Sequence, residues 1–299
     1  MKILVTGGKG QLANEIRSIL TSGTSEIGGC PIDVNKCSAT YIDIEELDIT
    51  KVNDVKKFIN ELKPDVIINC AAFTNVDGCE TNKDGAFKVN ALGSRNLAMA
   101  AEEIGAKLIH VSTDYVFSGE TRKQALSEYD EVGPQSVYGT TKLLGEKYVQ
   151  QFCSKYYIVR TAWLYGYVGN NFVYTMRKLG QNNDAITVVN DQRGNPTNAN
   201  DLAYHLLKLI NTEEYGIYHC TGEGECSWHD FAKKIIELSG EKCVVNPCTS
   251  EEYEKNAKKA VAKRPAFSSL DNMMLRSTVG NEMRNWEDAI ECFIKKLNR

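Results

Sequence analysis

The segment "VTGGKGQLAN", residues 5–14, joins a short apolar run to an amphipathic stretch and decides the fold. Gly7 and Gly10 allow the backbone to turn sharply and to approach a bound group closely. The helix that follows would offer free N–H groups and the positive end of its dipole, which together bind a pyrophosphate. Ala13 stands where a third glycine is usual, and its small side chain still permits close helix–strand packing. A glycine turn in the first strand–helix unit therefore predicts a dinucleotide site.

Strands and helices are expected to alternate through the first half of the chain. Apolar runs bounded by glycine or proline predict strands, and apolar residues spaced three or four apart predict helices. This alternation predicts an α/β fold with a Rossmann-like, doubly wound parallel sheet and helices on both faces. The expected strands are 2–7, 64–72, 106–113 and 156–163, and the expected helices are 10–20, 51–63, 85–105 and 136–152.

The second half of the chain is less regular. A stretch with charge clusters and two prolines, residues 240–284, is expected to be irregular. We expect residues 1–160 to form the dinucleotide-binding domain. Residues 161–299 should form most of a smaller, partly discontinuous substrate lobe, with segments that return to the first domain. The helices expected in this half are 171–180, 200–211, 227–239 and 285–298.

The composition is that of an ordinary soluble protein of 299 residues with a net charge of −4. This charge gives no reason to expect a nucleic-acid or membrane surface. No apolar run reaches the roughly 18 residues of a membrane span, and "MKILVTGG" at the start lacks the apolar core of an export signal. We therefore expect a cytoplasmic protein whose ten cysteines are free thiols.

One cluster of residues has the side chains that bind metals, "HCTGEGECSWH", residues 219–229. His219 and Cys220 follow an expected strand, so their side chains should point to opposite faces. We expect a strand and a loop at this position and no metal site.

A dinucleotide site also needs an acid at the end of the second strand, to bind the ribose hydroxyls of the adenosine. Asp33 lies nearer the usual spacing of about 20 residues, whereas Asp43 is followed closely by the next expected helix. We favour Asp43 and keep Asp33 as the alternative. Ile44 and Glu45 follow Asp43, with no lysine or arginine for a 2′-phosphate, so NADH is favoured over NADPH.

The segment "VYGTTKLLGEK", residues 137–147, places Tyr138 four residues before Lys142 on an expected helix. The two side chains should lie one turn apart on the same face. A free tyrosine has a pKa of about 10, poorly matched to proton transfer at neutral pH, and a nearby ammonium group lowers that pKa. The spacing alone is common on helices, so its meaning depends on the rest of the chain.

Further motifs occur in a fixed order along the chain. After the glycine turn come "NCAAFTNVDGCE" (69–80), "STDYVFSGE" (112–120) and the Tyr138–Lys142 pair, and this order resembles the extended short-chain dehydrogenase/reductase family. Later segments are similar to one branch of that family, the reductases that act on nucleotide sugars. They are "RTAWLYG" (160–166), "GNNFVYTM" (169–176), "NDQRGNPT" (190–197), "CSWHDFA" (226–232) and "KRPAFSSL" (263–270).

The resemblance implies a reaction and the residues that carry it. NADH or NADPH would reduce the C4 ketone of dTDP-4-dehydro-L-rhamnose to give dTDP-L-rhamnose for cell-surface polysaccharide. Tyr138 would donate the proton, Lys142 would assist it, and Thr113 would hydrogen-bond the reacting oxygen. Asn90 would support the site through a backbone or water contact. The implied cofactor-binding residues are Gly7, Gly10, Gln11, Leu12, Asp43, Asp48, Ile49, Ala71, Ala72, Phe73, Tyr138 and Lys142, and the implied substrate-binding residues are Thr113, Asp114, Trp163, Asn171 and Arg264.

Two alternatives stay open beside this reductase. A nucleotide-sugar epimerase or dehydratase would use the same fold, but related dehydratases carry an Asp-Glu pair where this chain has Asp114-Tyr115. A catalytically silent regulatory subunit that binds nucleotide is the other alternative, and the intact Thr113, Tyr138 and Lys142 argue against it. Cys70 and Phe73 depart from the residues usual in the family at their positions.

The resemblance also allows a homodimer. Some family members dimerise around a magnesium ion bound by an acid on the first helix, where this chain has Glu15. One glutamate does not make a metal site, so we expect Glu15 to be a surface carboxylate; the resemblance allows Mg²⁺, but we do not assign it.

Overall fold

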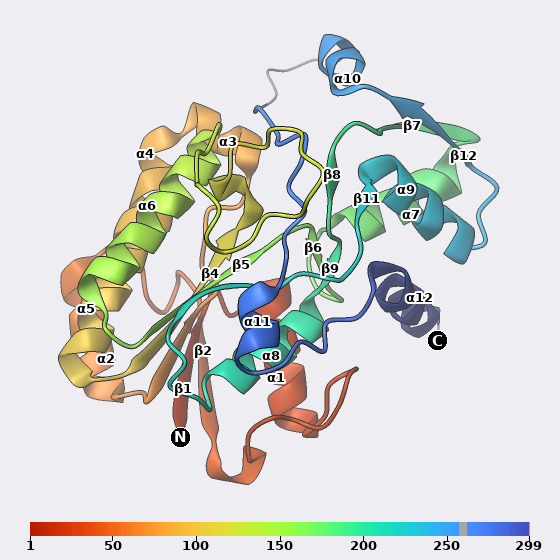
Figure 1. The fold of residues 1–299 in the computed structure, drawn as a ribbon. Coiled ribbons are helices and arrows are strands. Elements are labelled where there is room, and N and C mark those ends of the chain that lie inside the picture. Colours follow the sequence, from red (N-terminus) through yellow and green to blue (C-terminus); the bar gives the residue numbers. More distant parts are fainter. Residues whose placement is uncertain (257–261, 299) are drawn as a thin grey trace.

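A computed structural model of the chain describes residues 1–256 and 262–298. Its centre is a six-stranded sheet in which all neighbouring strands are parallel, in the order β10-β5-β4-β3-β1-β2 (Figure 1). The order reverses between β1 and β3, which creates the crevice where ligands bind in such sheets. The strands are β1 (Lys2–Thr6), β2 (Ser38–Ile42), β3 (Val66–Asn69), β4 (Lys107–Thr113), β5 (Tyr156–Thr161) and β10 (Gly216–His219).

Helices cover both faces of the sheet, because alternate strand residues point to opposite faces and both sets are apolar. In β1, Ile3 and Val5 belong to one buried cluster and Leu4 to the other. The doubly wound α/β fold is thus confirmed. One face is covered by α1 (Gln11–Ser22), α8 (Ala199–Leu209) and α11 (Met273–Ser277), and the other by α2 (Val52–Leu62), α5 (Ser94–Ile104) and α6 (Val137–Phe152).

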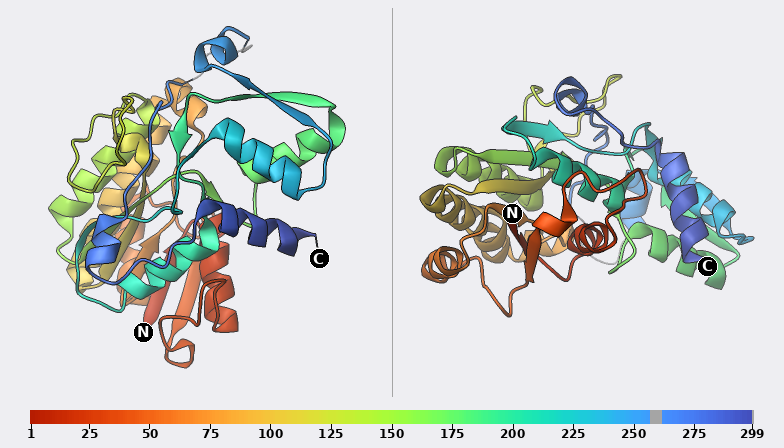
Figure 2. Two further views of the ribbon diagram at one scale, coloured as in Figure 1. Left: turned by 45° about the vertical axis from the view of Figure 1, so that its right-hand side comes forward. Right: turned by 90° about the horizontal axis from the view of Figure 1, so that it is seen from below.

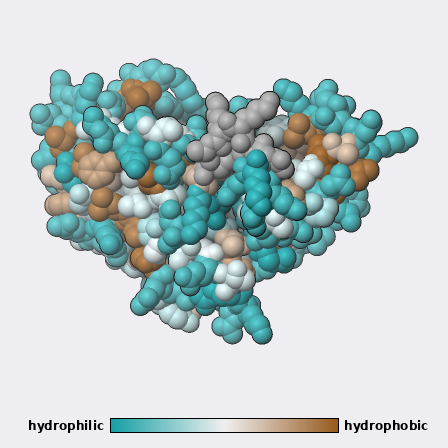
Figure 3. All heavy atoms as spheres, turned by 90° about the horizontal axis from the view of Figure 1, so that it is seen from above, coloured by the Kyte–Doolittle hydropathy of each residue, from teal (hydrophilic) through white to brown (hydrophobic). Residues whose placement is uncertain are grey.

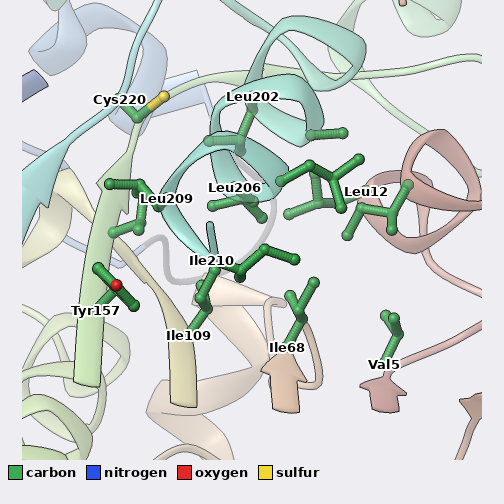
Figure 4. Close-up of a cluster of buried hydrophobic side chains, with 14 of the residues drawn as sticks. Val5, Leu12, Ile68, Ile109, Tyr157, Leu202, Leu206, Leu209, Ile210 and Cys220 are labelled. Carbon is green, nitrogen blue, oxygen red and sulfur yellow. The ribbon is translucent and has the colours of Figure 1, made fainter. Parts of the chain in front are cut away.

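The cluster on the first face joins distant parts of the chain (Figure 4). Leu12 of α1 and Leu206 of α8 meet side chains of the central strands, among them Val5 and Ile68, and these four are at most 4% exposed. Burial of such apolar surface contributes roughly 25 cal/mol per Å². A helix from the second half of the chain is therefore part of the core of the first half.

The helix expected at 85–105 is interrupted. The structure has α4 (Lys83–Ala86), a π-helical segment η2 (Phe87–Gly93) and then α5. A Cβ on Gly145 of α6 would lie 2.4 Å from the backbone oxygen of Asn90, so this glycine allows α6 to pack closely against η2. π-helical turns often occur at functional sites, and this one carries Asn90.

The second half builds a smaller layer beside the sheet, with α7, α9 and α12 around their own apolar cluster (Figures 1 and 2). The described parts of the range 240–284, residues 240–256 and 262–284, are more regular than expected, because β12 pairs in parallel with β7 and two short helices, α10 and α11, follow it. The helices are α7 (Phe172–Asn182), α9 (Trp228–Leu238), α10 (Ser250–Asn256) and α12 (Trp286–Leu297), and the strands are β6 (Leu164–Tyr165), β7 (Ala185–Val189), β8 (Arg193–Gly194), β9 (Thr197–Asn198), β11 (Cys226–Ser227) and β12 (Val244–Cys248).

The outer surface is mostly hydrophilic on the face shown in Figure 3, with hydrophobic residues in small separate patches. None of the described helices has the length and apolar composition needed to cross a membrane. All ten cysteines are free, as expected. The remaining short elements are η1 (Val34–Lys36), α3 (Val76–Thr81) and η3 (Asp114–Val116).

Candidate active site

A cavity of about 930 Å³ opens at the carboxyl ends of β1 to β5, at the point where the strand order reverses. Most of the residues that the sequence predicted for the site line it. Only two of them, Asn171 and Arg264, are not among the lining residues. Those that line the cavity are Gly7, Gly10, Gln11, Leu12, Asp43, Asp48, Ile49, Ala71, Ala72, Phe73, Thr113, Asp114, Tyr138, Lys142 and Trp163.

The glycine turn has the geometry that a pyrophosphate needs. Gly7 has a φ of +65°, and a Cβ there would lie 2.9 Å from the backbone nitrogen of Ala71. Gly10 is the N-cap of α1 and offers no side chain to its first N–H groups, which are thus available to an anion. These two features fit a dinucleotide, whose diphosphate would lie against the start of α1.

Asp43 directly follows β2 and lines the cavity, whereas Asp33 caps η1 and does not. Ile44 and Glu45 after Asp43 bring no cation, but a lysine from another loop lies beside this acid in the fold. Lys9 of the glycine turn donates its backbone N–H to Asp43 Oδ2 (3.0 Å), and its Nζ pairs with Glu45 at 2.7 Å. Sequence reasoning missed this cation because it lies on a different loop from the acid.

The wall beyond β2 is fixed by hydrogen bonds and one close approach. Asp48 accepts bonds from the backbone N–H (3.0 Å) and the hydroxyl (2.7 Å) of Thr50. The backbone oxygen of Ile49 accepts a bond from Asn96 Nδ2 (2.9 Å). A Cβ on Gly93 would lie 2.6 Å from Ile49 Cδ1, so the glycine leaves room for this side chain.

Two buried amides support the loop after β3. Asn90 accepts a hydrogen bond from the backbone N–H of Phe73 (2.8 Å) and donates to its carbonyl oxygen (3.2 Å) and to Thr141 (3.1 Å). Asn69 accepts from the N–H of Ala71 (3.2 Å). The expected backbone contact of Asn90 is thus present, at Phe73, which lines the cavity.

Tyr138 and Lys142 lie one turn apart on α6, and both line the cavity. Lys142 Nζ donates to the carbonyl oxygen of Val111 (2.6 Å), and burial lowers the pKa of this amine to about 8. Burial raises the pKa of Tyr138, against a smaller opposite effect of its hydrogen bond with Thr113. The expectation of a lowered tyrosine pKa is therefore wrong for this structure, because burial disfavours the phenolate and the nearby carboxylate of Asp114 acts in the same direction.

Thr113 is the last residue of β4, and its hydroxyl contacts the two residues that follow it. Its hydroxyl donates to Asp114 Oδ1 (2.9 Å) and accepts from the N–H of Tyr115 (3.2 Å). Asp114 is 2% exposed, and its Oδ2 has no hydrogen-bond partner among the described residues. Burial raises the pKa of this carboxyl to about 6.

Two stacked tryptophans form the far wall of the cavity. The rings of Trp163 and Trp228 lie 3.6 Å apart at an angle of 8°. Trp163 has a φ of +46°, unusual for a bulky residue, and a Cβ on Gly194 would lie 2.8 Å from its ring. Sequence reasoning missed Trp228, because nothing near it in the chain shows that it meets Trp163.

Asn171 and Arg264 have other partners in this structure. Asn171 caps α7 and donates to the carbonyl oxygen of Gly166 (2.8 Å). Arg264 NH2 pairs with Asp77 Oδ2 at 3.1 Å. Asn170, the residue before Asn171, lines the cavity instead.

Glu15 is not the surface carboxylate that the sequence predicted. It is 4% exposed and accepts a hydrogen bond from Asn200 Nδ2 (2.8 Å), and burial raises its pKa. Within residues 1–256 and 262–298, no three His, Cys, Asp or Glu side chains gather in a way that could hold a metal ion. His219 instead lies against the carbonyl oxygens of Leu126 and Asp271.

Comparison with known proteins gives one consistent result. A family model described as "RmlD substrate binding domain" matches residues 1–299. A dTDP-4-dehydrorhamnose reductase from Aggregatibacter actinomycetemcomitans is 37% identical over 302 residues, with 97% of each chain covered.

Two solved structures of dTDP-4-dehydrorhamnose reductases match over nearly their whole length. The one from Clostridium acetobutylicum is 48% identical with a TM-score of 0.92 and covers 100% of both chains. The one from Bacillus anthracis, in complex with NADP, is 39% identical with a TM-score of 0.90 and covers 99% of both. The resemblance seen in the sequence is thus confirmed, and the chain belongs to the dTDP-4-dehydrorhamnose reductase family.

Proposed function

We propose that this chain reduces the C4 ketone of dTDP-4-dehydro-L-rhamnose to dTDP-L-rhamnose, with NADH or NADPH as reductant. The observation that carries the proposal is that Thr113, Tyr138 and Lys142 line the same cavity as the glycine turn around Gly7. A proton donor therefore lies in reach of a dinucleotide held at the start of α1. The names of the relatives support the identity of the sugar.

The residues of the chain supply binding, orientation and the proton. A bound NAD(P)H supplies the hydride for C4 of the sugar. The half-buried Tyr138 hydroxyl stays protonated at neutral pH because its pKa is raised, so it is available to donate to the developing alkoxide. Thr113 offers a hydroxyl at the same point, and the buried ammonium of Lys142 stabilises negative charge there.

Asp43 supports a preference for NADH. Its carboxylate lies at the end of β2, where it would accept bonds from two ribose hydroxyls and repel a 2′-phosphate. Lys9 lies beside it and gives NADPH a partner, so the preference should be modest. The relative from Bacillus anthracis was solved with NADP.

Asp114 and Trp163 would contact the sugar, because both line the cavity next to the reacting groups. Asn171 and Arg264 would contact the rest of the nucleotide sugar. Arg264 would first leave Asp77, and their pairing is partly exposed and thus weak.

Three expectations accompany this function. We place the boundary between the dinucleotide domain and the substrate lobe near residue 160. We infer a cytoplasmic enzyme, since its cofactor and its nucleotide sugar are metabolites of that compartment. We also infer a homodimer, from the family alone.

One contact bears on the alternative dehydratase or epimerase. Tyr115 stands where a dehydratase needs a second acid, and its ring meets that of Tyr138 edge to face at 5.4 Å. Burial raises the pKa of the Tyr115 hydroxyl, so this group stays protonated. It therefore cannot act as the base that accepts the proton removed in an elimination.

The test is oxidation of NADH and NADPH by the purified chain, followed at 340 nm. The substrate is dTDP-4-keto-6-deoxyglucose with its 3,5-epimerase present. We expect oxidation that stops at one equivalent of sugar, and a loss of about 10²- to 10⁴-fold in Tyr138→Phe with unchanged NADH binding. Absence of oxidation by folded protein that binds dinucleotide would reject this substrate and favour another sugar nucleotide or a regulatory role.

A further inference from the structure

Glu146 continues the row of reacting side chains along α6. Tyr138, Lys142 and Glu146 follow one another at intervals of four residues, so they share one face of the helix. Lys142 and Glu146 are 2% and 1% exposed. A carboxylate thus lies one turn beyond the lysine, on the side of the helix that faces the sheet.

Glu146 is held by two strands of that sheet. Its Oε1 accepts bonds from the hydroxyl of Ser112 and from Arg160 Nε (3.0 Å), and its Oε2 accepts from Arg160 NH2 (2.8 Å). Ser112 in β4 and Arg160 in β5 are paired in register, and Thr113 directly follows Ser112. The cluster of Ser112, Glu146 and Arg160 therefore lies directly behind the three groups proposed for catalysis.

Stability alone does not account for this cluster. Taking a carboxylate and a guanidinium out of water costs about as much as their attraction returns, and apolar pairs of similar size often serve as well. Arg160 also leaves its NH1 without a hydrogen-bond partner among the described residues. A buried pair of this kind at the base of a reactive lysine calls for a functional explanation.

We propose that Glu146 is a positioning residue for the reduction: clamped by Ser112 and Arg160 one helical turn from Lys142, its carboxylate keeps that amine protonated behind Tyr138. The proposal rests on the proposed function for the role of Lys142. Its electrostatic basis does not, because a buried ammonium needs a nearby negative charge whatever the reaction.

The other titratable groups around Lys142 cannot replace Glu146. Cys70 follows β3, and burial raises the pKa of its thiol to about 12, so it stays neutral. His110 in β4 is kept neutral by burial and by the positive charge of Lys142. Glu146 opposes the effect of burial on the pKa of Lys142, and its carboxylate is itself paired with Arg160.

The sign of each substitution follows from these charges. Glu146→Gln removes the negative charge one turn from Lys142 and leaves the Arg160 cation without its partner, so Lys142 should lose its proton at lower pH. Arg160→Met removes that cation, so Lys142 should keep its proton to higher pH. Loss of packing alone would not shift the titration of Lys142 in opposite directions, and a role in the reduction requires the pH profile of kcat/KM to shift with it.

The experiment titrates Lys142 directly by ¹³C NMR. The full chain carries lysine labelled at Cε, and Lys142→Met assigns the resonance. We expect the midpoint to fall by about one pH unit in Glu146→Gln and to rise by about half a unit in Arg160→Met. The alkaline limb of kcat/KM should move in the same directions.

Two further variants complete the test. Glu146→Gln/Arg160→Met removes both charges of the pair, which proteins tolerate better than the loss of one, and should keep the lowered midpoint if the single variant does not fold. Asp201→Asn breaks another buried pair, with Arg284, and should leave Lys142 unchanged.

Each outcome decides the proposal. An unmoved Lys142 resonance in folded Glu146→Gln, or shifts of the same sign in Glu146→Gln and Arg160→Met, would overturn it. A wild-type chain that oxidises no NAD(P)H would instead count against the proposed function, while the NMR titration would still decide the role of Glu146.

Discussion

A Cβ on Gly7 would lie 2.9 Å from the backbone nitrogen of Ala71, closer than such atoms approach one another in proteins. The two residues follow β1 and β3, the neighbouring strands at which the sheet order reverses. Only the hydrogen of a glycine fits between these loops. The contact therefore links a feature visible in the sequence, the glycine turn, to the geometry of the crevice.

Gly7→Ala should lower both stability and dinucleotide binding. The substitution meets a left-handed φ, which costs about 1–2 kcal/mol, and a backbone clash of about 1–3 kcal/mol. Displacement of either loop should weaken NADH binding at least about tenfold. Gly105→Ala is the matched control, because its φ is +71° but a Cβ there meets nothing within 4 Å.

Denaturant unfolding and fluorescence titration with NADH measure the two effects. Gly105→Ala should lose only about 1 kcal/mol and bind NADH normally. Equal losses in the two variants would mean that the approach of Gly7 to Ala71 does not matter.

Asp43→Asn should shift the chain from NADH towards NADPH. Loss of the carboxylate removes its repulsion of a 2′-phosphate, while Lys9 remains beside the site. We expect the ratio of kcat/KM for NADPH to that for NADH to rise about tenfold, equivalent to about 1.4 kcal/mol. Asp33→Asn, at the residue that caps η1 outside the cavity, should leave the ratio unchanged. A shift in Asp33→Asn instead would restore the alternative acid.

The sequence predicted the features that depend on residues close together in the chain. β1 has a clear apolar pattern, α6 begins directly after its capping residue Ser136, and the glycine turn between β1 and α1 has its usual spacing. Contacts between segments that are far apart in the chain were not predicted, because no local pattern indicates them. Lys9 beside Asp43 and Trp228 against Trp163 are set by how the strands and helices pack.

Two further errors have physical causes. The π-helical segment η2 could not be told from an α-helix by the spacing of its apolar residues, so the sequence predicted one continuous helix. Glu15 was expected at the surface because carboxylates rarely lie inside, but α8 packs over α1 and supplies Asn200 as a partner. Burial likewise reversed the expected direction of the Tyr138 pKa shift.

Asp114→Asn should stabilise the protein at pH 8. The carboxyl of Asp114 has a pKa of about 6, above its ordinary value of 3.8, because burial disfavours its charged form. The native state thus holds this proton more tightly than the unfolded state, and the resulting stability is full below pH 4 and lost as pH rises through about 6. The difference amounts to at most about 3 kcal/mol.

Thermal unfolding of Asp114→Asn and the wild type between pH 4 and pH 8 tests this. The gain in Tm from the substitution should grow across that range and be smallest at pH 4. Activity should fall at the same time, because the carboxylate next to Thr113 is proposed to contact the sugar. A gain in Tm that does not change with pH would show that Asp114 is not the titrating group.

Trp228→Leu should weaken binding of the sugar more than binding of NADH. Trp228 is the first residue of α9 and stacks on Trp163, whose left-handed backbone costs about 1–3 kcal/mol and must be held by its surroundings. An aromatic pair contributes about 0.5–1.5 kcal/mol beyond the area it buries. We therefore expect KM for the sugar to rise about three- to tenfold, with kcat and the Kd for NADH within about twofold of the wild type.

The stack also has its own spectroscopic signature, since two parallel indoles in contact give an exciton couplet in far-UV circular dichroism. Trp228→Leu should abolish this couplet. Trp286→Phe is the control, because Trp286 is the third tryptophan of the chain and lies in the apolar cluster of the second half. It should lower Tm and leave both the couplet and KM for the sugar unchanged. A lost couplet with unchanged KM would mean that the stack is only structural and that Trp163 binds no sugar.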